Sequence, residues 1–256
     1  MRLVEGLVAA AVIGLGGMIA VKALTRPARP GATSSVAANP EDSIYKVPLA
    51  RTAAERMRIA AARATRVQEL VTDRGTGTFI GEILLENDST VRHWTGRDAA
   101  PVRLWLQLPV GVADYRASFA GYVSQALDAW SAVDGQPVRF VLASDSATAH
   151  VVVVWTPLLN GNRIGLTRIE AVNDTIRTGR ITIATQREGG IALRDEDIAR
   201  CALHEVGHLL GLAHTVDLMS IMAPESAQPS LGAKDRATVA LLYALPIGSI
   251  KAGAIY

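Results

Sequence analysis

The sequence predicts an α+β fold, in which strands, a helix and a histidine-rich helix follow one another within one domain. Three observations support this fold class. Residues 102–108 alternate between apolar and polar side chains, as a strand does when one of its faces is buried. Residues 115–133 repeat apolar side chains at helical spacing. Residues 204–214 contain three histidines, two of which lie four positions apart and so share one face of a helix.

The elements before the histidines are predicted in order from these patterns. One side of the first strand carries Val102, Leu104, Leu106 and Leu108. The helix over 115–133 presents five apolar side chains to a core, namely Phe119, Val123, Ala126, Leu127 and Trp130. A second strand is expected at 138–142. The β-branched run of 149–155 suits a central strand buried on both faces, and 180–185 alternates as a strand near an edge would.

The histidine-containing helix is expected to begin near Asp195, which suits an N-cap. It would direct four apolar side chains toward the core, namely Ile198, Ala202, Val206 and Leu209. A closing helix is marked by Val239, Leu242 and Tyr243. The remaining length is enough for one domain with a sizeable core.

The string from His204 to His214 reads HEVGHLLGLAH, and its positions suit separate chemical roles. His204 and His208 project from one helix face, where two imidazoles can bind one Zn²⁺. Glu205 lies beside that face, placed to take a proton from a zinc-bound water. Gly211 can adopt the left-handed conformation that ends a helix, so the chain can turn and bring in His214 as a third ligand. Three protein ligands leave one position for water, which is typical of a catalytic zinc site.

The residues after the histidines resemble a known family. Met222 follows His214 by eight positions within Ser220-Ile221-Met222-Ala223-Pro224, whereas the offset of Met219 is wrong. This spacing and the Met-x-Pro ending resemble the Met-turn of the metzincins, and among them most closely that of the matrixins. The resemblance covers roughly 100–246 and is strongest over 201–224.

The resemblance implies a zinc endopeptidase with one catalytic Zn²⁺. It also implies the metzincin, or zincin-like, catalytic fold, a mixed twisted sheet that packs on a zinc helix. It assigns His204, His208 and His214 as metal ligands and Glu205 as the general base. Met222 would form the apolar floor of the Met-turn beneath the metal.

Outside the motif, the sequence departs from the matrixin pattern. Only His93 and His150 remain for a second histidine zinc site, which is too few ligands. Glu225 and Ser226 stand where many matrixins have a tyrosine, so the specificity pocket is not defined by the resemblance. Four scattered aspartates follow no calcium-loop pattern and are interpreted as surface carboxylates: Asp145, Asp174, Asp195 and Asp197.

Cys201 is the sole cysteine, so an intramolecular disulfide is excluded and the pro-segment cysteine that silences many matrixins is absent. It precedes His204 by three residues on the same predicted helix, where a thiolate could bind zinc. A small buried hydrophobic side chain is the preferred interpretation.

Five regions are expected along the chain. Residues 1–24 include sixteen uncharged, mainly apolar residues and fit either a signal peptide or a membrane anchor preceding the catalytic domain. The others are a linker at 25–48, a helical, pro-like region at 49–100, the catalytic domain at 101–246 and a tail at 247–256. For the helix expected at 49–72, in the pro-like region, a solvated surface helix is the preferred interpretation. Packing on the catalytic domain or resting on an anionic membrane are the alternatives.

We expect an extracytoplasmic catalytic domain, secreted or anchored to the membrane by an uncleaved N-terminal segment. The positive charges of Lys22, Arg26 and Arg29 favour the opposite orientation. A net charge of +2 gives no indication of nucleic-acid binding. A peptide or protein substrate would lie extended beside the strand near 179–185.

Two alternative functions remain at this point. One is a catalytically inactive, zinc-binding, membrane-tethered interaction module. The other is a zinc hydrolase that acts on a substrate other than a peptide. Retention of Glu205 argues against the first, because loss of the base is the simplest route to an inactive site. The sequence does not define the oligomeric state.

Overall fold

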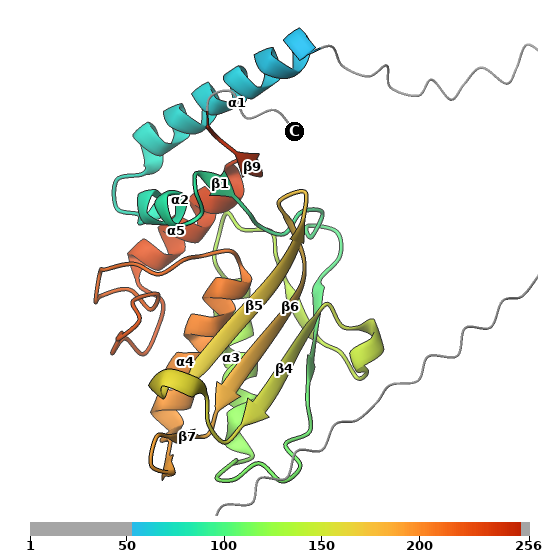
Figure 1. The fold of residues 1–256 in the computed structure, drawn as a ribbon, viewed down its shortest axis with the longest axis vertical. Coiled ribbons are helices and arrows are strands. Elements are labelled where there is room, and N and C mark those ends of the chain that lie inside the picture. Colours follow the sequence, from blue (N-terminus) through green and yellow to red (C-terminus); the bar gives the residue numbers. More distant parts are fainter. Residues whose placement is uncertain (1–52, 252–256) are drawn as a thin grey trace, which may run out of the picture. The chain divides into compact units, whose positions relative to one another are not determined.

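The computed structural model describes residues 53–251, whose arrangement is shown in Figure 1. The predicted N-terminal segment 1–24 and the linker 25–48 lie outside the described residues, as does the end of the predicted tail, 252–256. Within the described part of the chain, no helix is long and apolar enough to cross a membrane.

A five-stranded sheet forms the centre of this region, with the strand order β3-β2-β4-β6-β5 (Figure 1). Neighbouring strands are parallel, except that β5 runs antiparallel to β6. The sheet is therefore mixed, as expected. Its strands are β2 (Val102–Leu106), β3 (Phe140–Leu142), β4 (Val151–Thr156), β5 (Gly165–Val172) and β6 (Thr175–Ala184).

β4 is central in the sheet, as predicted, but only one of its faces is fully buried. Its alternate side chains Val151, Val153 and Trp155 are buried, and those between them are half-buried. The prediction of burial on both faces is therefore wrong. The reason is that two helices, α3 and α4, pack together against one face of the sheet, with α4 contacting β5 and β6.

The strand predicted near an edge lies in the interior of the sheet. β6 contains residues 180–184 and pairs with β4 on one side and β5 on the other. The edge is formed by β5, a strand that the periodicity of the sequence did not reveal. The first strand is also shorter than predicted, because β2 ends at Leu106 and Leu108 is 75% exposed.

The two helices on the sheet confirm the predicted apolar faces. α3 (Ser118–Ser131) buries all five side chains expected to face the core. α4 (Asp195–Leu209) buries Ile198, Ala202, Val206 and Leu209. Trp130 near the end of α3 donates a hydrogen bond from Nε1 to the carbonyl oxygen of Leu203 on α4, at 2.8 Å. Apolar packing and this buried hydrogen bond therefore fix α4 against α3.

α4 begins differently from the prediction. Arg194 is the N-cap, so Asp195 is the first helical residue rather than the cap. The carboxylate of Asp195 reaches the other helix instead. It accepts hydrogen bonds from Ser118 Oγ and Tyr122 Oη, both at 2.8 Å, and it lies 2.7 Å from Nη2 of Arg116. Asp195 therefore links the start of α4 to the start of α3.

The segments before and after the sheet share its hydrophobic core. α5 packs against α1 and α2, and β1 pairs with β9. On α1, Val67 and Leu70 are buried whereas Met57 is exposed, so the second half of this helix packs and the first half is solvated. These elements are α1 (Ala53–Arg74), α2 (Ile80–Glu86), β1 (Thr90–Val91), α5 (Ala233–Ala244) and β9 (Gly248–Ser249). The short elements η1 (Ser146–Thr148), η2 (Asn160–Asn162), β7 (Gln186–Arg187) and β8 (Ile191–Ala192) complete the described chain.

The contacts of Asp195 predict a pH-dependent link between α3 and α4. Hydrogen bonds from Ser118 and Tyr122, together with the charge of Arg116, hold the pKa of Asp195 below its ordinary value. A depressed folded-state pKa stabilises the fold above the unfolded-state pKa, and the contribution is lost as the pH falls through the folded-state pKa. We expect Asp195→Ala to unfold at a lower urea concentration than the wild type at pH 7. The difference should shrink below pH about 4.

Glu196→Ala is the matched control, because Glu196 is exposed and lies in the same first turn of α4. Like Asp195→Ala, it removes one negative charge near the N-terminus of α4, where such a charge interacts favourably with the helix dipole. It should destabilise the fold less than Asp195→Ala at pH 7. Equal losses for the two variants would contradict the proposed link between the helices.

Candidate metal centre

Three histidine side chains converge at the end of α4. His204 and His208 come from the helix, and His214 comes from the loop that follows it. Their Nε2 atoms are separated by 3.0 Å (204 to 208), 3.2 Å (208 to 214) and 3.3 Å (204 to 214). Zinc–nitrogen bonds of about 2.0–2.1 Å at tetrahedral angles would place the nitrogens about 3.3–3.4 Å apart. The spacing therefore fits a single zinc ion.

The other ring nitrogens fix the orientation of the two helical histidines. Nδ1 of His204 lies 2.8 Å from the carbonyl oxygen of Ile221, and Nδ1 of His208 lies 2.8 Å from that of Leu212. A carbonyl oxygen only accepts, so each Nδ1 carries the proton and each Nε2 presents its lone pair to the metal position. Burial lowers the pKa of His204, and it lowers the pKa of His208 to about 3. Both rings are therefore neutral near pH 7, as metal ligands must be.

Gly211 makes the turn that brings His214 to the other two histidines. Its φ is +100°, in the left-handed region, as the motif predicted. A Cβ at this position would lie 2.4 Å from the carbonyl oxygen of Arg92. Backbone conformation and close packing therefore both require glycine here.

Met222 is buried against α4 next to Gly207, and its apolar surroundings fit the floor expected from the resemblance. It is fully buried, and its Sδ would be 2.3 Å from a Cβ at Gly207, on the buried side of α4. Its backbone N–H donates to Ser220 Oγ at 3.0 Å. Met219, by contrast, is 70% exposed, which agrees with its rejection from the sequence.

A carboxylate from α5, which the sequence did not reveal, holds this turn in place. Asp235 accepts hydrogen bonds from the hydroxyl of Ser220 and from the backbone N–H groups of Ile221, at 3.3 Å, and Gly232, at 2.8 Å. The side chain is fully buried, so these donors replace the solvation that the carboxylate has lost. Asp235 therefore connects the turn that contains Met222 to the closing helix.

Glu205 is a buried carboxyl group beside the histidines, and the edge strand β5 forms its surroundings. Burial raises its pKa to about 7. Thr167 on β5 donates from Oγ1 to Glu205 Oε2 at 2.6 Å. Gly165 leaves room for the carboxyl group, because a Cβ there would lie 2.2 Å from Oε1 of Glu205. Neither Thr167 nor Gly165 was found from the sequence, since only recognition of β5 as a strand could have indicated them.

Cys201 packs under β5 rather than joining the histidines. It is buried, and its Sγ lies 3.3 Å from the carbonyl oxygen of Ile164. Desolvation by burial, followed by the nearby Glu205, raises the pKa of the thiol well above its ordinary value. A buried thiol of raised pKa is a poor source of thiolate, so its position agrees with a packing role.

The other candidate ligands are engaged elsewhere. His93 is buried between the carbonyl oxygens of Trp94 and Leu245, and His150 Nδ1 accepts from the backbone of Arg103. Within residues 53–251, the three motif histidines form the one group of at least three potential metal-binding side chains. The four aspartates considered for calcium interact with nearby protein groups. Asp145 accepts a hydrogen bond from the backbone of Ala147, and Asp174 pairs with Arg92. Asp195 contacts α3, and Asp197 pairs with arginines.

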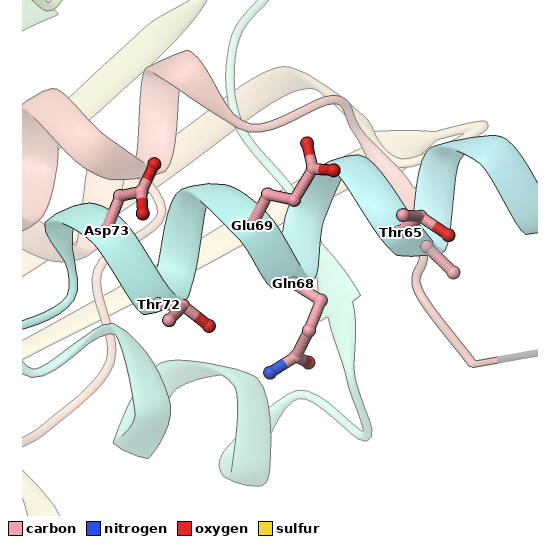
Figure 2. Close-up of a pocket in the computed structure, with 6 residues that line it drawn as sticks. Thr65, Gln68, Glu69, Thr72 and Asp73 are labelled. Carbon is pink, nitrogen blue, oxygen red and sulfur yellow. The ribbon is translucent and has the colours of Figure 1, made fainter.

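A cleft of about 1260 Å³ runs over the three histidines and Glu205. Its lining includes residues of β5 and of the segment 221–227, where Glu225 and Ser226 stand at the positions at which many matrixins have a tyrosine. A second hollow, of about 560 Å³, is lined entirely by α1. Figure 2 shows its polar side chains spread around that single helix, with Glu69 and Asp73 on one side and Gln68 and Thr72 on the other. The metal centre therefore belongs to the first cleft.

We expect Gly211→Ala to lower the free energy of unfolding by about 1–3 kcal/mol, the cost of a non-glycine residue in the left-handed region. The clash with Arg92 should also displace His214 and weaken zinc binding. Urea unfolding of the metal-free protein and competition with a zinc chelator measure the two effects.

Gly121→Ala is the control, because Gly121 is exposed on α3 and a Cβ there meets no atom within 4 Å. It should be neutral or stabilising, since alanine favours helices. If Gly211→Ala behaved like Gly121→Ala, the requirement for glycine at the turn would be wrong.

Comparison with known families agrees with this arrangement. The family model described as Matrixin matches residues 113–244, which is just over half of the chain and includes α3, four strands of the sheet, α4, the histidines and α5. No curated protein matches the chain in a sequence search. The order of the elements and the three converging histidines agree with the family match, and the chain belongs to the matrixin family of zinc metallopeptidases.

Proposed function

We propose that this chain is a zinc-dependent endopeptidase in which Glu205 is the general base. The observation that carries the proposal is the buried carboxyl group of Glu205, which lines the same cleft as three histidines at zinc spacing. A structural zinc site binds no reacting water, so a buried carboxyl group beside its ligands would have no catalytic role there. A hydrolytic site requires one within reach of the attacking water.

His204, His208 and His214 would hold the metal, and their neutral rings present three nitrogens to one side of it. Zinc bound there would supply a Lewis acid that lowers the pKa of water and polarises the scissile carbonyl. Glu205 would accept the proton of the attacking water and later deliver it to the leaving amine. Because the positive charge of a metal favours the ionised form, Glu205 is expected to act as a carboxylate in the loaded enzyme.

The substrate is expected along β5 rather than β6. The sequence predicts a peptide beside residues 179–185, but β6, which contains most of them, already pairs on both sides. β5 pairs only with β6 among the described strands, so its outer backbone edge is available. An extended peptide can add to such an edge through main-chain hydrogen bonds. Antiparallel alignment is favoured because it is the slightly more stable pairing.

The first test separates metal binding from catalysis. Glu205→Gln should keep zinc bound and slow peptide cleavage by at least about 100-fold, the usual contribution of a general base. His208→Ala should lose both zinc and activity. Metal analysis and the digestion of a peptide library with and without chelator provide the measurements.

Glu188→Gln is the control, since Glu188 is an exposed carboxylate outside the cleft lining. It should cleave like the wild type. If Glu205→Gln cleaved as fast as the control, Glu205 would not be the base. A zinc-loaded wild type that cleaves no peptide would favour the inactive interaction module instead.

Thr167 is expected to position Glu205. Thr167→Val keeps the shape of the side chain but removes the hydrogen bond to Oε2, so kcat should fall about tenfold, with KM and zinc content nearly unchanged. The hydrogen bond lowers the pKa of Glu205, so its loss should move the acid limb of the pH–rate profile to higher pH.

Thr167→Ser should restore most of the activity, because it restores the hydroxyl. Thr178→Val is a matched control on the neighbouring strand, where the same type of hydrogen bond joins Thr178 to the exposed Glu170. An unchanged pH profile in Thr167→Val would show that the threonine has only a packing role.

A further inference from the structure

One end of the cleft is lined by three arginines, Arg163, Arg187 and Arg200. They come from separate parts of the chain, namely the connection that leads into β5, the short strand β7 and the helix α4. Figure 1 shows β7 and the start of α4 at the same end of the sheet as the connection into β5. The three arginines therefore line the cleft from segments that lie near the start of β5.

Arg187 and Arg200 pair with the buried carboxylate of Asp197, which also pairs with Arg194, a residue outside the cleft. Asp197 Oδ1 lies 2.6 Å from Nη2 of Arg200 and 3.6 Å from Nη2 of Arg187, and its Oδ2 lies 3.2 Å from Nε of Arg194. Glu196 is a second carboxylate whose charge acts on Arg194, so two carboxylates stand against three guanidinium groups. The cluster around Asp197 therefore keeps an excess of positive charge at neutral pH.

Arg163 adds to this excess. It is exposed, and no ion pair within residues 53–251 involves it. The segment 221–227 contributes a single exposed carboxylate to the cleft lining, Glu225. The opposite end of the cleft has no excess of positive charge, because Arg92 pairs with Asp174 at 3.3 Å and Glu86 adds a further negative charge there. The cleft is therefore electrically asymmetric along its length.

The arginines retain donors for a ligand. A guanidinium has five N–H donors, and Arg200 and Arg187 approach Asp197 through one nitrogen each. Their side chains are 26% and 40% exposed, so the remaining N–H groups can be reached from the cleft. Such donors match the geometry of a carboxylate, which they can bind through two parallel hydrogen bonds.

The direction of the substrate decides which of its residues meet the arginines. β5 starts at Gly165, close to Arg163, and runs toward Ala171 at the opposite end of the cleft. A peptide antiparallel to β5 therefore places the residues that follow the scissile bond at the arginine end. We propose that the cleft selects peptides with acidic side chains on the C-terminal side of the scissile bond. This inference rests on the proposed peptidase function for the position of that bond.

The test uses acetylated and amidated ten-residue peptide libraries with randomised central positions, so that side chains supply the only fixed carboxylates. One pair carries three Glu or three Gln at the C-terminal end, and a second pair carries them at the N-terminal end. Binding is measured by competition with a fluorescent peptide on zinc-loaded Glu205→Gln protein, and cleavage is measured on the wild type. We expect the C-terminal Glu library to bind and be cleaved about fivefold better than its Gln partner at low salt. The preference should largely disappear at about 0.5 M salt, because salt screens exposed charges.

The variants identify the source of the preference. Arg163→Gln removes an exposed charge with no ion pair, so it should fold normally and reduce the Glu preference. Arg200→Gln should also reduce the Glu preference. It should still fold, because Arg187 and Arg194 remain paired with the buried Asp197. Arg177→Gln is the control, because Arg177 is exposed on β6 and does not line the cleft.

Equal binding of the C-terminal Glu and Gln libraries would overturn the inference, even if both are cleaved. A preference for the N-terminal Glu library, or one that survives loss of both Arg163 and Arg200, would overturn it as well. If C-terminal Glu peptides are bound preferentially but the zinc-loaded wild type cleaves nothing, the proposed function fails. The acidic selectivity of the cleft would then stand as a binding property.

Discussion

The close packing of α4 against its neighbours is the constraint on which this structure depends. At three places the helix or its continuation leaves no room for a Cβ. Gly207 faces Met222, Gly211 faces the carbonyl oxygen of Arg92, and Gly179 of β6 faces the buried Leu209. Because protein interiors are close-packed, a displacement at any of these contacts would move the helix as a whole. The two helical histidines and the base are attached to that helix, so the packing sets their positions relative to His214 and the Met222 turn.

This packing also places ionisable groups where solvation is poor. The rings of His204 and His208 are held neutral by burial, and the buried carboxyl group of Glu205 accepts a hydrogen bond from Thr167. Neutral imidazoles near one another lose solvation without gaining a partner for their Nε2 lone pairs. A divalent cation would supply that partner, and it would also favour ionised Glu205. Metal binding and stability of the fold are therefore expected to be coupled through α4.

The parts of the site that lie on one sequence motif could be predicted, and the parts contributed by other elements could not. The spacing of His204, His208 and His214 specifies both ligand type and helical face, and Gly211 adopts the predicted left-handed conformation. The periodicity of α3 correctly identified its buried side chains because one of its faces is wholly apolar. Thr167 and Asp235 act on the site through contacts with residues distant in sequence, and no local pattern indicates such contacts.

β5 was missed, and β6 was placed near an edge, for a related reason. An edge strand has one free side and is only partly buried, so Arg168 and Glu170 interrupt its apolar pattern without disturbing its hydrogen bonds. β6 alternates even though it is interior, because the helices of the described region that pack on the sheet, α3 and α4, cover one of its faces. Alternation therefore reports which faces are buried, whereas position in the sheet depends on pairing, which hydropathy does not encode.

The position of β5 joins the two halves of the proposed chemistry. Side chains of a strand project above and below the sheet, whereas its hydrogen-bonding groups point sideways within the sheet. Thr167 can therefore reach across to Glu205 on α4 while the outer edge of the same strand remains available to a peptide. A peptide that pairs with this edge would add to the sheet without displacing the hydroxyl that orients the base. Binding along β5 would also restrict the motion of the strand, so the arrangement that positions Glu205 would be most rigid when a substrate is present.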